Sequence, residues 1–166
     1  FLIIYSIGIP AGVTLAKNKG KTIDRALSSV LFVQYSLPVA WIGTMLIIFF
    51  TSNYYGEWMD LFPPYGLGKI GPEYGFWEKF TDRAYHLVLP VFCSVIGSFA
   101  YISMQMRCGM MSVLRQDYIR TAFAKGLAPN TIYWKHALRN SLIPIITIFS
   151  SFLPAMIGGS VIIEFL

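Results

Sequence analysis

Few residues of this chain could take part in chemistry, and their spacing excludes the commonest sites. Gly20-Lys21-Thr22 has the residues that end a phosphate-binding loop, but that motif needs a glycine five residues earlier, where Leu15 stands. The two histidines, His86 and His136, fall at opposite ends of an apolar run long enough to cross a bilayer, so they cannot share a metal ion. We therefore expect no metal and no bound cofactor in this chain.

Polar side chains within the apolar runs are sparse. Gln34, Gln105 and Glu164 are the strongest of them, and the sequence shows no acid pair or nucleophile with a base at that depth. An ion-coupled transporter or an intramembrane hydrolase usually carries such a pair. Glu164 is either a carboxylate at the membrane interface or part of the outer mouth of a pathway. The chain is not expected to be an enzyme.

The elements that position these residues are long apolar segments. Hydrophobic residues make up 55% and charged residues 13% of the chain, and mean hydropathy is +0.59, which is typical of an integral membrane protein. The expected fold is all-α, a polytopic transmembrane helical bundle, in a piece of a longer subunit. Four membrane helices are expected, over residues 1–16, 26–50, 87–106 and 141–166.

Charge predicts the orientation of the loops between these helices. The loops 17–25 and 107–140 are rich in Lys and Arg, whereas the loop 51–86 has more acidic than basic residues. By the positive-inside rule the two basic loops should be cytoplasmic and the loop 51–86 external. The net charge of +5 is thus divided between two loops, and we expect no nucleic-acid partner.

Glycine and proline recur within the apolar runs. Gly8-Ile-Pro-Ala-Gly12 has the GxxxG spacing that allows close approach of two helices. Prolines in membrane helices either serve packing alone or mark kinked helices that rock around a cavity. The residues that could line a pathway or form a kink are Pro38, Gln105, Pro144, Gly158, Gly159 and Glu164.

The loop 107–140 has the pattern of two short helices. Residues 113–125 lack Pro and Gly, Gly126 suits the position after a helix, and Pro129 suits the first turn of a second helix that runs to Arg139. Such a pair either docks to a partner or lies on the membrane surface. The first helix has three apolar residues on one face: Ile119, Ala122 and Phe123.

Two segments of this loop closely resemble a known motif. Asp117-Tyr-Ile-Arg-Thr-Ala-Phe-Ala-Lys-Gly-Leu127 and His136-Ala-Leu-Arg-Asn-Ser-Leu-Ile-Pro144 are similar to the EAA loop of bacterial ABC-importer permeases, in the variant of the dipeptide, oligopeptide and nickel importer family. Ser36-Leu-Pro38 and Gly158-Gly-Ser-Val-Ile-Ile-Glu164 extend the similarity over nearly the whole chain. In that family a full subunit has about six membrane helices, and this piece resembles the second to the fifth.

The resemblance implies the role of the loop. The first short helix, as the coupling helix, would dock into a cleft of a cytoplasmic ATPase, which binds ATP and Mg²⁺. Its apolar face (Ile119, Ala122 and Phe123) would fill a groove there. Further implied partners are a second homologous permease, a periplasmic or extracellular substrate-binding protein and the lipid bilayer of the bacterial inner membrane. The residues implied in docking are Asp117, Tyr118, Ile119, Arg120, Thr121, Ala122, Phe123, Lys125, Gly126, His136, Arg139 and Asn140.

The sequence departs from the motif at some positions, and these departures leave the details of partner docking open. Arg120-Thr121-Ala122 occupies the Glu-Ala-Ala slot, as in the peptide branch, but Phe123 stands where that branch usually has a basic residue. The resemblance implies an importer of di- or oligopeptides. A permease for nickel or a metal chelate is the alternative, and a structural membrane subunit without transport is an alternative of another class.

Overall fold

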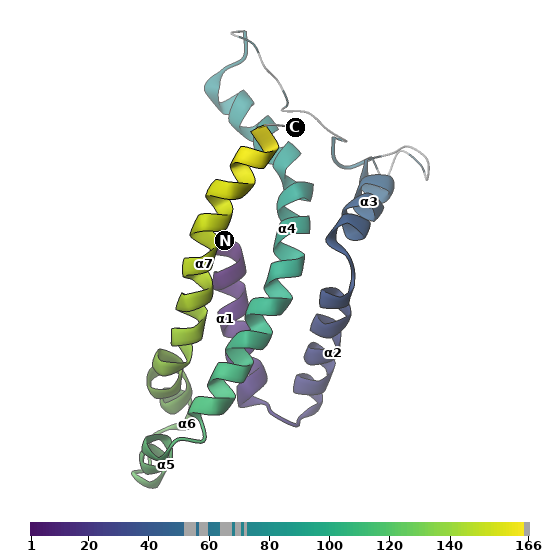
Figure 1. Ribbon diagram of the computed structural model, residues 1–166. Helices are drawn as coiled ribbons and strands as arrows, with labels where there is room; N and C mark the ends of the chain where they lie inside the picture. The colour runs from purple at the N-terminus through teal and green to yellow at the C-terminus, as the bar shows by residue number, and fades with distance from the viewer. Residues whose placement is uncertain (52–55, 57–59, 64–67, 69–70, 72, 165–166) are drawn as a thin grey trace. The chain divides into compact units, whose positions relative to one another are not determined.

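The structure, a computed structural model, describes residues 1–51, 56, 60–63, 68, 71 and 73–164, with side chains up to residue 151. Within these ranges the chain forms helices joined by turns, and no strand (Figure 1). The all-α class expected from the sequence is confirmed. Much of the expected external loop 51–86 lies outside the described residues.

The elements follow one another along the chain with short connections, apart from the segment between α3 and α4. They are α1 Leu2–Lys17, α2 Thr22–Ser36, α3 Val39–Phe50, α4 Phe76–Val113, α5 Asp117–Ala124, α6 Pro129–Thr131, a π-helical segment Ile132–Ala137 and α7 Leu138–Glu164. The chain divides into two compact units. Phe1–Leu31 and Phe99–Leu166 form the first, and Phe32–Ser98 forms the second.

In the first unit α1 packs closely against α4 through its glycines. A β-carbon at Gly12 would lie 2.5 Å from the Met106 β-carbon and 2.6 Å from the Ser103 carbonyl oxygen, so no larger residue fits. Gly8 faces Ile102 in the same way, with 3.1 Å between its built β-carbon and the nearest side-chain carbon. The close approach expected from the GxxxG spacing is confirmed.

In the second unit the run expected as one helix over residues 26–50 is divided. Pro38 has φ −61° and ψ 128° and stands between α2 and α3, whose axes differ by 92°. Proline disfavours helical backbone at the preceding residue, here Leu37, and removes one N–H from the helix. The kink expected at Pro38 is therefore a complete break. Beside it, the Gln34 side-chain amide donates to the Ile96 carbonyl of α4.

Helix α4 is longer than the apolar run 87–106 that predicted it. Its 38 residues give a length of about 57 Å, against roughly 30 Å for the hydrocarbon core of a bilayer. The helix begins at Phe76, inside the expected external loop, and ends at Val113, inside the basic loop 107–140.

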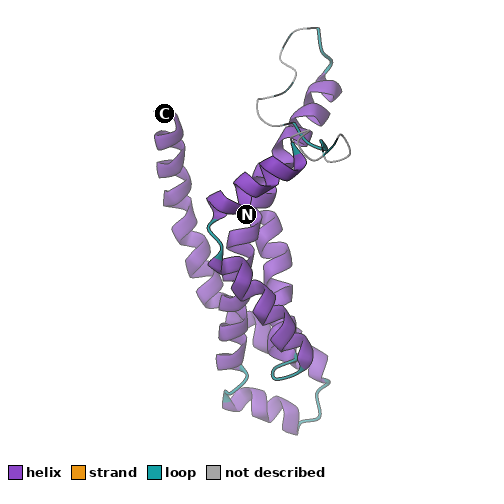
Figure 2. Cartoon of the chain, turned by 90° about the vertical axis from the view of Figure 1, so that its right-hand side faces the viewer, coloured by secondary structure: helices purple, strands orange, loops and turns teal. Residues whose placement is uncertain are grey.

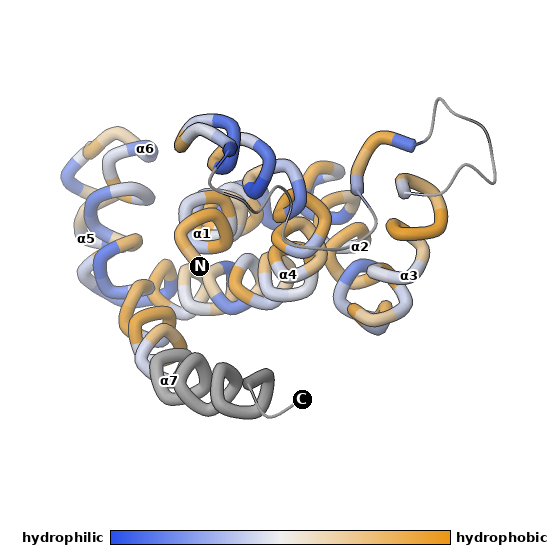
Figure 3. Tube along the Cα trace, turned by 90° about the horizontal axis from the view of Figure 1, so that it is seen from above, coloured by the Kyte–Doolittle hydropathy of each residue, from blue (hydrophilic) through white to orange (hydrophobic). Residues whose placement is uncertain are grey.

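Among the described residues, α4 alone is long and apolar enough to cross a membrane, and α2 with α3 adds a second span if the bent pair counts as one. Helix α1 is apolar but shorter. Figure 3 shows orange, hydrophobic residues along α1 and recurrent blue, hydrophilic residues along α5 in the same unit. This difference in hydropathy distinguishes the apolar helix α1 from the loop that follows α4.

Candidate functional site

The candidate site is the segment between α4 and α7, which begins with a turn. Helix α4 ends at Val113, and the Gln116 N–H donates to the Val113 carbonyl over 3.0 Å. Gln116 has extended backbone, with φ −73° and ψ 150°, and α5 begins at Asp117. The first short helix was expected from residue 113, so that expectation placed its start too early. Asp117 in the first turn suits the positive end of the helix dipole.

The inward face of α5 belongs to the protein's own core. Ile119 is fully buried and Ala122 is 8% exposed. Both join a single cluster of buried side chains from α1, α4, the π-helical segment and α7. Its other members are Val13, Ala16, Met106, Met110, Ile132, Ala137 and Ile145. The expectation that Ile119 and Ala122 fill a partner's groove is therefore wrong, because a neighbouring apolar surface within the chain already covers them.

Apolar side chains that flank the buried face of α5, or follow the end of the helix, remain exposed, and we call this exposed surface the outward face. Tyr118, Phe123 and Leu127 are 43%, 45% and 39% exposed. Figure 2 shows the helix lying crosswise to α7. Arg120 and Asp117 form an ion pair of 3.4 Å on the same surface, with side chains that are 74% and 95% exposed.

Gly126 ends α5 as the sequence predicts. Its φ is +74°, its N–H donates to the Phe123 carbonyl over 2.9 Å, and the Leu127 N–H donates to the Ala122 carbonyl over 3.3 Å. This pair of bonds is the Schellman arrangement, which satisfies two carbonyls at the helix end. The left-handed backbone requires glycine here, although a β-carbon would meet no other atom within 4 Å.

The second helix also begins as expected, with Pro129 in its first turn. It does not end at Arg139, because the π-helical segment Ile132–Ala137 passes directly into α7. The last helix therefore begins at Leu138, before the expected residue 141, and Ser141 and Pro144 both lie inside α7. The Ser141 hydroxyl donates to the Ala137 carbonyl over 2.8 Å, within the continuous helix.

Four of the expected site residues come together between α5 and α7. Tyr118, His136, Arg139 and Asn140 line a cavity of about 410 Å³ with Lys135. The Asn140 side-chain amide donates to the Tyr118 hydroxyl over 2.7 Å and so joins α5 to α7. The cavity is lined by cationic and polar groups, an environment that suits a carboxylate or a carbonyl oxygen.

Other expected residues lie elsewhere. The Thr121 hydroxyl donates to the Asp117 carbonyl over 3.0 Å, which is a bond within α5. Gln105 is half-buried in α4, and Lys125 is exposed at the end of α5. Gly158, Gly159 and Glu164 lie on the backbone of α7, and their surroundings fall outside the described side chains.

An ion pair that sequence reasoning missed fixes the loop between α1 and α2. The Arg107 guanidinium donates to both Asp24 carboxylate oxygens, over 2.9 Å from Nε and 3.0 Å from Nη2. The Gly20 N–H donates to the same carboxylate over 2.9 Å. Asp24 precedes the apolar run 26–50, and hydrogen bonding from Arg107 holds its pKa below the usual range despite burial. The signal available in the sequence was a lone acid in a basic loop.

Comparison with known proteins identifies the family. Residues 8–166 match the family described as binding-protein-dependent transport system inner membrane component. The chain is 39% identical to the oligopeptide transport system permease protein AppB of Bacillus subtilis, over 95% of this chain and 47% of that protein. It is 35% identical to the inner membrane ABC transporter permease protein YejB of Escherichia coli O157:H7, over 98% and 44%.

A third relative is the di/tripeptide transport system permease protein DppB of Pseudomonas aeruginosa, which is 34% identical over 96% of this chain and 50% of that protein. The chain thus spans about half the length of the curated relatives it matches. The resemblance drawn from the loop motif is confirmed. The chain belongs to the family of inner membrane components of binding-protein-dependent transport systems.

Proposed function

We propose that this chain is part of a membrane-spanning permease subunit of an ATP-driven importer, which moves di- and oligopeptides across the cytoplasmic membrane. Family membership supports the transport role. The names of the relatives AppB and DppB, which are oligopeptide and di/tripeptide permeases, support the peptide cargo. A nickel or metal-chelate cargo is the alternative within the same architecture.

The proposed topology is multi-pass, with the basic loops 17–25 and 107–140 on the cytoplasmic side. The excess of Lys and Arg in these loops supports this orientation. A contact joins the two loops, because the Lys17 ammonium donates to the Asn130 side-chain oxygen over 3.1 Å. Their proximity on one side of the membrane is what the proposed orientation requires.

The observation that carries the proposal is the two-faced character of α5. Its outward face presents Phe123 and Leu127, which a water-soluble partner could bury. Its inward face is fixed among the core side chains through Ile119 and Ala122. A partner that moves the outer face must therefore also move the core cluster, which reaches α1, α4 and α7. This is the mechanical coupling that an ATP-driven permease needs.

The proposed partners of this chain each have a separate role. Cytoplasmic ATPase subunits bind ATP and Mg²⁺ and receive α5, a second permease subunit completes the pathway, and a substrate-binding protein delivers the peptide on the outer side. The chain itself hydrolyses nothing in this scheme. Lys125 and Arg120, at the edge of the outward face, would meet acidic or carbonyl groups of the ATPase.

The docking part of the proposal is tested with two substitutions at one position. Phe123→Asp places a charge on the outward face, whereas Phe123→Leu keeps an apolar contact. In the complete complex we expect Phe123→Asp to reduce both ATPase co-purification and peptide uptake by about tenfold or more, the effect of losing one anchor residue. Phe123→Leu should retain most of both. Normal uptake with Phe123→Asp would overturn docking through this face.

The cargo is tested with the full-length subunit, its neighbouring permease, the ATPases and the binding protein in sealed vesicles. ATP-dependent uptake of a labelled short peptide is measured with and without excess nickel. Peptide uptake that nickel leaves unchanged supports the peptide cargo. Nickel accumulation without peptide uptake would replace the cargo and keep the architecture, and uptake of neither would favour a structural subunit.

A further inference from the structure

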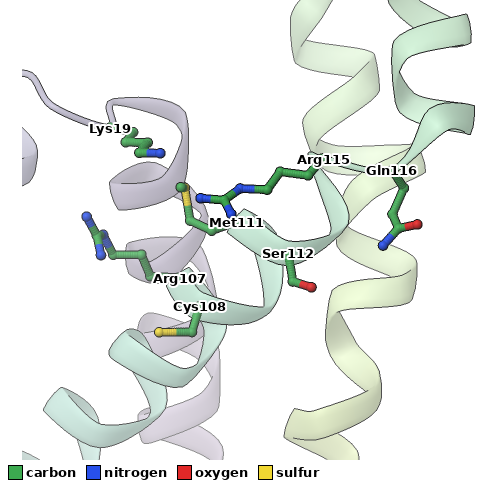
Figure 4. A pocket seen from close by; sticks show the side chains of 7 residues that line it. All are labelled: Lys19, Arg107, Cys108, Met111, Ser112, Arg115 and Gln116. Atoms are coloured by element: carbon green, nitrogen blue, oxygen red, sulfur yellow. The ribbon is translucent and has the colours of Figure 1, made fainter.

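A cavity distinct from the one beneath α5 lies where α1 and α4 end. It has a volume of about 580 Å³, and its lining includes Lys19, Arg107, Met111, Ser112 and Arg115 (Figure 4). Figure 4 shows the side chains of Lys19 and Arg115 extending toward Met111 from opposite sides. The cavity thus combines separate cationic groups with an apolar floor.

The cavity carries positive charge that no acidic residue of its lining neutralises. Three of the residues that line it are basic, and none is acidic. Arg107 is neutralised by its bonds of 2.9 Å and 3.0 Å to Asp24. Lys19 and Arg115 form no ion pair with any residue that the structure describes. The two cations that face the cavity therefore favour an anion between them.

The cavity begins at the level expected for lipid headgroups and extends beyond it. The apolar run of α4 ends at Met106, and residues 107–113 continue the helix for about 10 Å. The polar headgroup region on each side of a bilayer is roughly 5–8 Å thick. Lys19 lies two residues after the end of α1 at Lys17. Arg107 therefore lies next to the hydrocarbon boundary, and Arg115 lies further from it, with a long side chain that extends back toward Met111. Met111 is suited to contact the apolar part of a lipid.

We propose that this cavity binds the phosphate group of an anionic membrane lipid, such as phosphatidylglycerol, in the cytoplasmic leaflet. Arg115 offers a planar fork for two phosphate oxygens, and Lys19 offers a compact charge opposite it. The Ser112 hydroxyl, also in the lining, is a further donor. Basic pockets between membrane helices on the cytoplasmic side are suited to such headgroups. The inference goes beyond the proposed transport function but uses its membrane orientation.

The site also bears on the coupling loop. Arg115 belongs to the turn that separates α4 from α5, two residues before Asp117. A lipid phosphate held by Arg115 and Lys19 would fasten this turn to the loop that follows α1. The lipid would then act as a positioning element for the start of α5, while its acyl chains remain in the bilayer.

The test uses the complete detergent-solubilised complex with the full-length subunit, without ATP or peptide. Binding of added phosphatidylglycerol and phosphatidylcholine is measured by native mass spectrometry, and inorganic phosphate is tested as a competitor. The variant is Lys19→Gln with Arg115→Gln. The matched control is Lys21→Gln with Arg25→Gln, which removes the same charge from exposed positions that do not line the cavity.

We expect phosphatidylglycerol to bind and phosphatidylcholine not to bind at comparable concentration. The Lys19 and Arg115 variant should lose at least about tenfold in affinity for phosphatidylglycerol, and the control variant should lose little. A charge-preserving variant, Lys19→Arg with Arg115→Lys, should retain binding and separates a lost contact from a lost fold.

Three results would overturn the proposal. An equal loss of affinity for phosphatidylglycerol in the variant and its control would show that net charge alone determines binding. Displacement of the lipid by millimolar inorganic phosphate would assign the cavity to a soluble anion. Cross-linking of the Lys19→Cys variant to an ATPase subunit, with unchanged lipid binding, would assign the cavity to an acidic side chain of that partner. Because no transport is measured, none of these results bears on the peptide import proposal.

Discussion

The two basic loops of this chain are held in place in different ways. The short loop, residues 17–25, depends on one charged contact in which Asp24 accepts bonds of 2.9 Å and 3.0 Å from Arg107. The Asp24 side chain is 6% exposed and the Arg107 side chain is 24% exposed. The long loop, residues 107–140, depends instead on apolar side chains that are buried in the core cluster.

The difference has a physical consequence for each loop. A buried ion pair fixes one position, but its net stabilisation is small because both charges lose hydration. Apolar packing distributes the stabilisation over several side chains, and each contributes in proportion to the area that it buries. The long loop can therefore be anchored on its inner face while its outer face stays available to a partner.

The largest expected effect comes from the anchor of the long loop. Ile119→Ala should destabilise the protein by about 3 kcal/mol, because Ile119 is fully buried and truncation leaves a cavity. Phe123→Ala, on the exposed face of the same helix, should cost less than about 0.5 kcal/mol. The two variants are compared by thermal unfolding in the same detergent. Similar losses would mean that α5 is not anchored through its inner face.

The ion pair of the short loop should give the next largest effect. Asp24→Asn leaves Arg107 without its partner, and we expect a loss of about 2 kcal/mol, below the usual cost for a fully buried pair because Arg107 is partly exposed. Arg107→Leu combined with Asp24→Asn should cost at least about 1 kcal/mol less than the sum of the two single changes. Additive losses in this double-mutant cycle would show that the two side chains do not stabilise each other.

The sequence predicts the helices and one helix end well. The apolar runs identify α1, α4 and α7, and the position of Gly126 fixes the end of α5, because these signals are local. The GxxxG spacing likewise identifies the face of α1 that meets α4. In each of these cases the residue type alone limits the backbone or the distance between helices.

The errors have long-range causes. The three apolar residues of α5 were assigned to one docking face, but the structure buries Ile119 and Ala122 and leaves Phe123 exposed. The pattern of a helix shows which residues share a face, not whether that face meets a partner or the same chain. The pair Asp24 and Arg107 joins residues 83 positions apart, a contact that no local pattern reveals. At Pro38 the sequence predicts a kink but does not show that the helix is completely interrupted there.

The two loops share one backbone feature, which predicts a smaller effect of equal size in each. Gly20 has φ +77° and Gly126 has φ +74°, and a β-carbon at either would meet no atom within 4 Å. Gly20→Ala and Gly126→Ala should each cost about 1–2 kcal/mol from the left-handed backbone alone. Asn at either position should cost less, since it tolerates this conformation. Thermal unfolding of the four variants makes the comparison.

A marked difference between the two alanine variants would mean that side-chain contacts, rather than backbone conformation, decide one of them. Gly20→Ala keeps the N–H that bonds to Asp24, so a larger loss at Gly20 would show that this bond needs the original backbone angles. A larger loss at Gly126 would show that the Schellman bonds of α5 are cooperative with the packing of Ala122.

The smallest effect is expected for the exposed ion pair on α5. Arg120 and Asp117 are 3.4 Å apart and largely exposed, so water and salt screen their attraction. Arg120→Ala, Asp117→Ala and the double variant should each change stability by less than about 0.5 kcal/mol, with a coupling energy near zero. A coupling as large as that of Asp24 and Arg107 would remove the contrast between the loops. If Arg120→Ala instead lowers peptide uptake without a change in stability, the contact of Arg120 that matters for function is with the ATPase and not with Asp117.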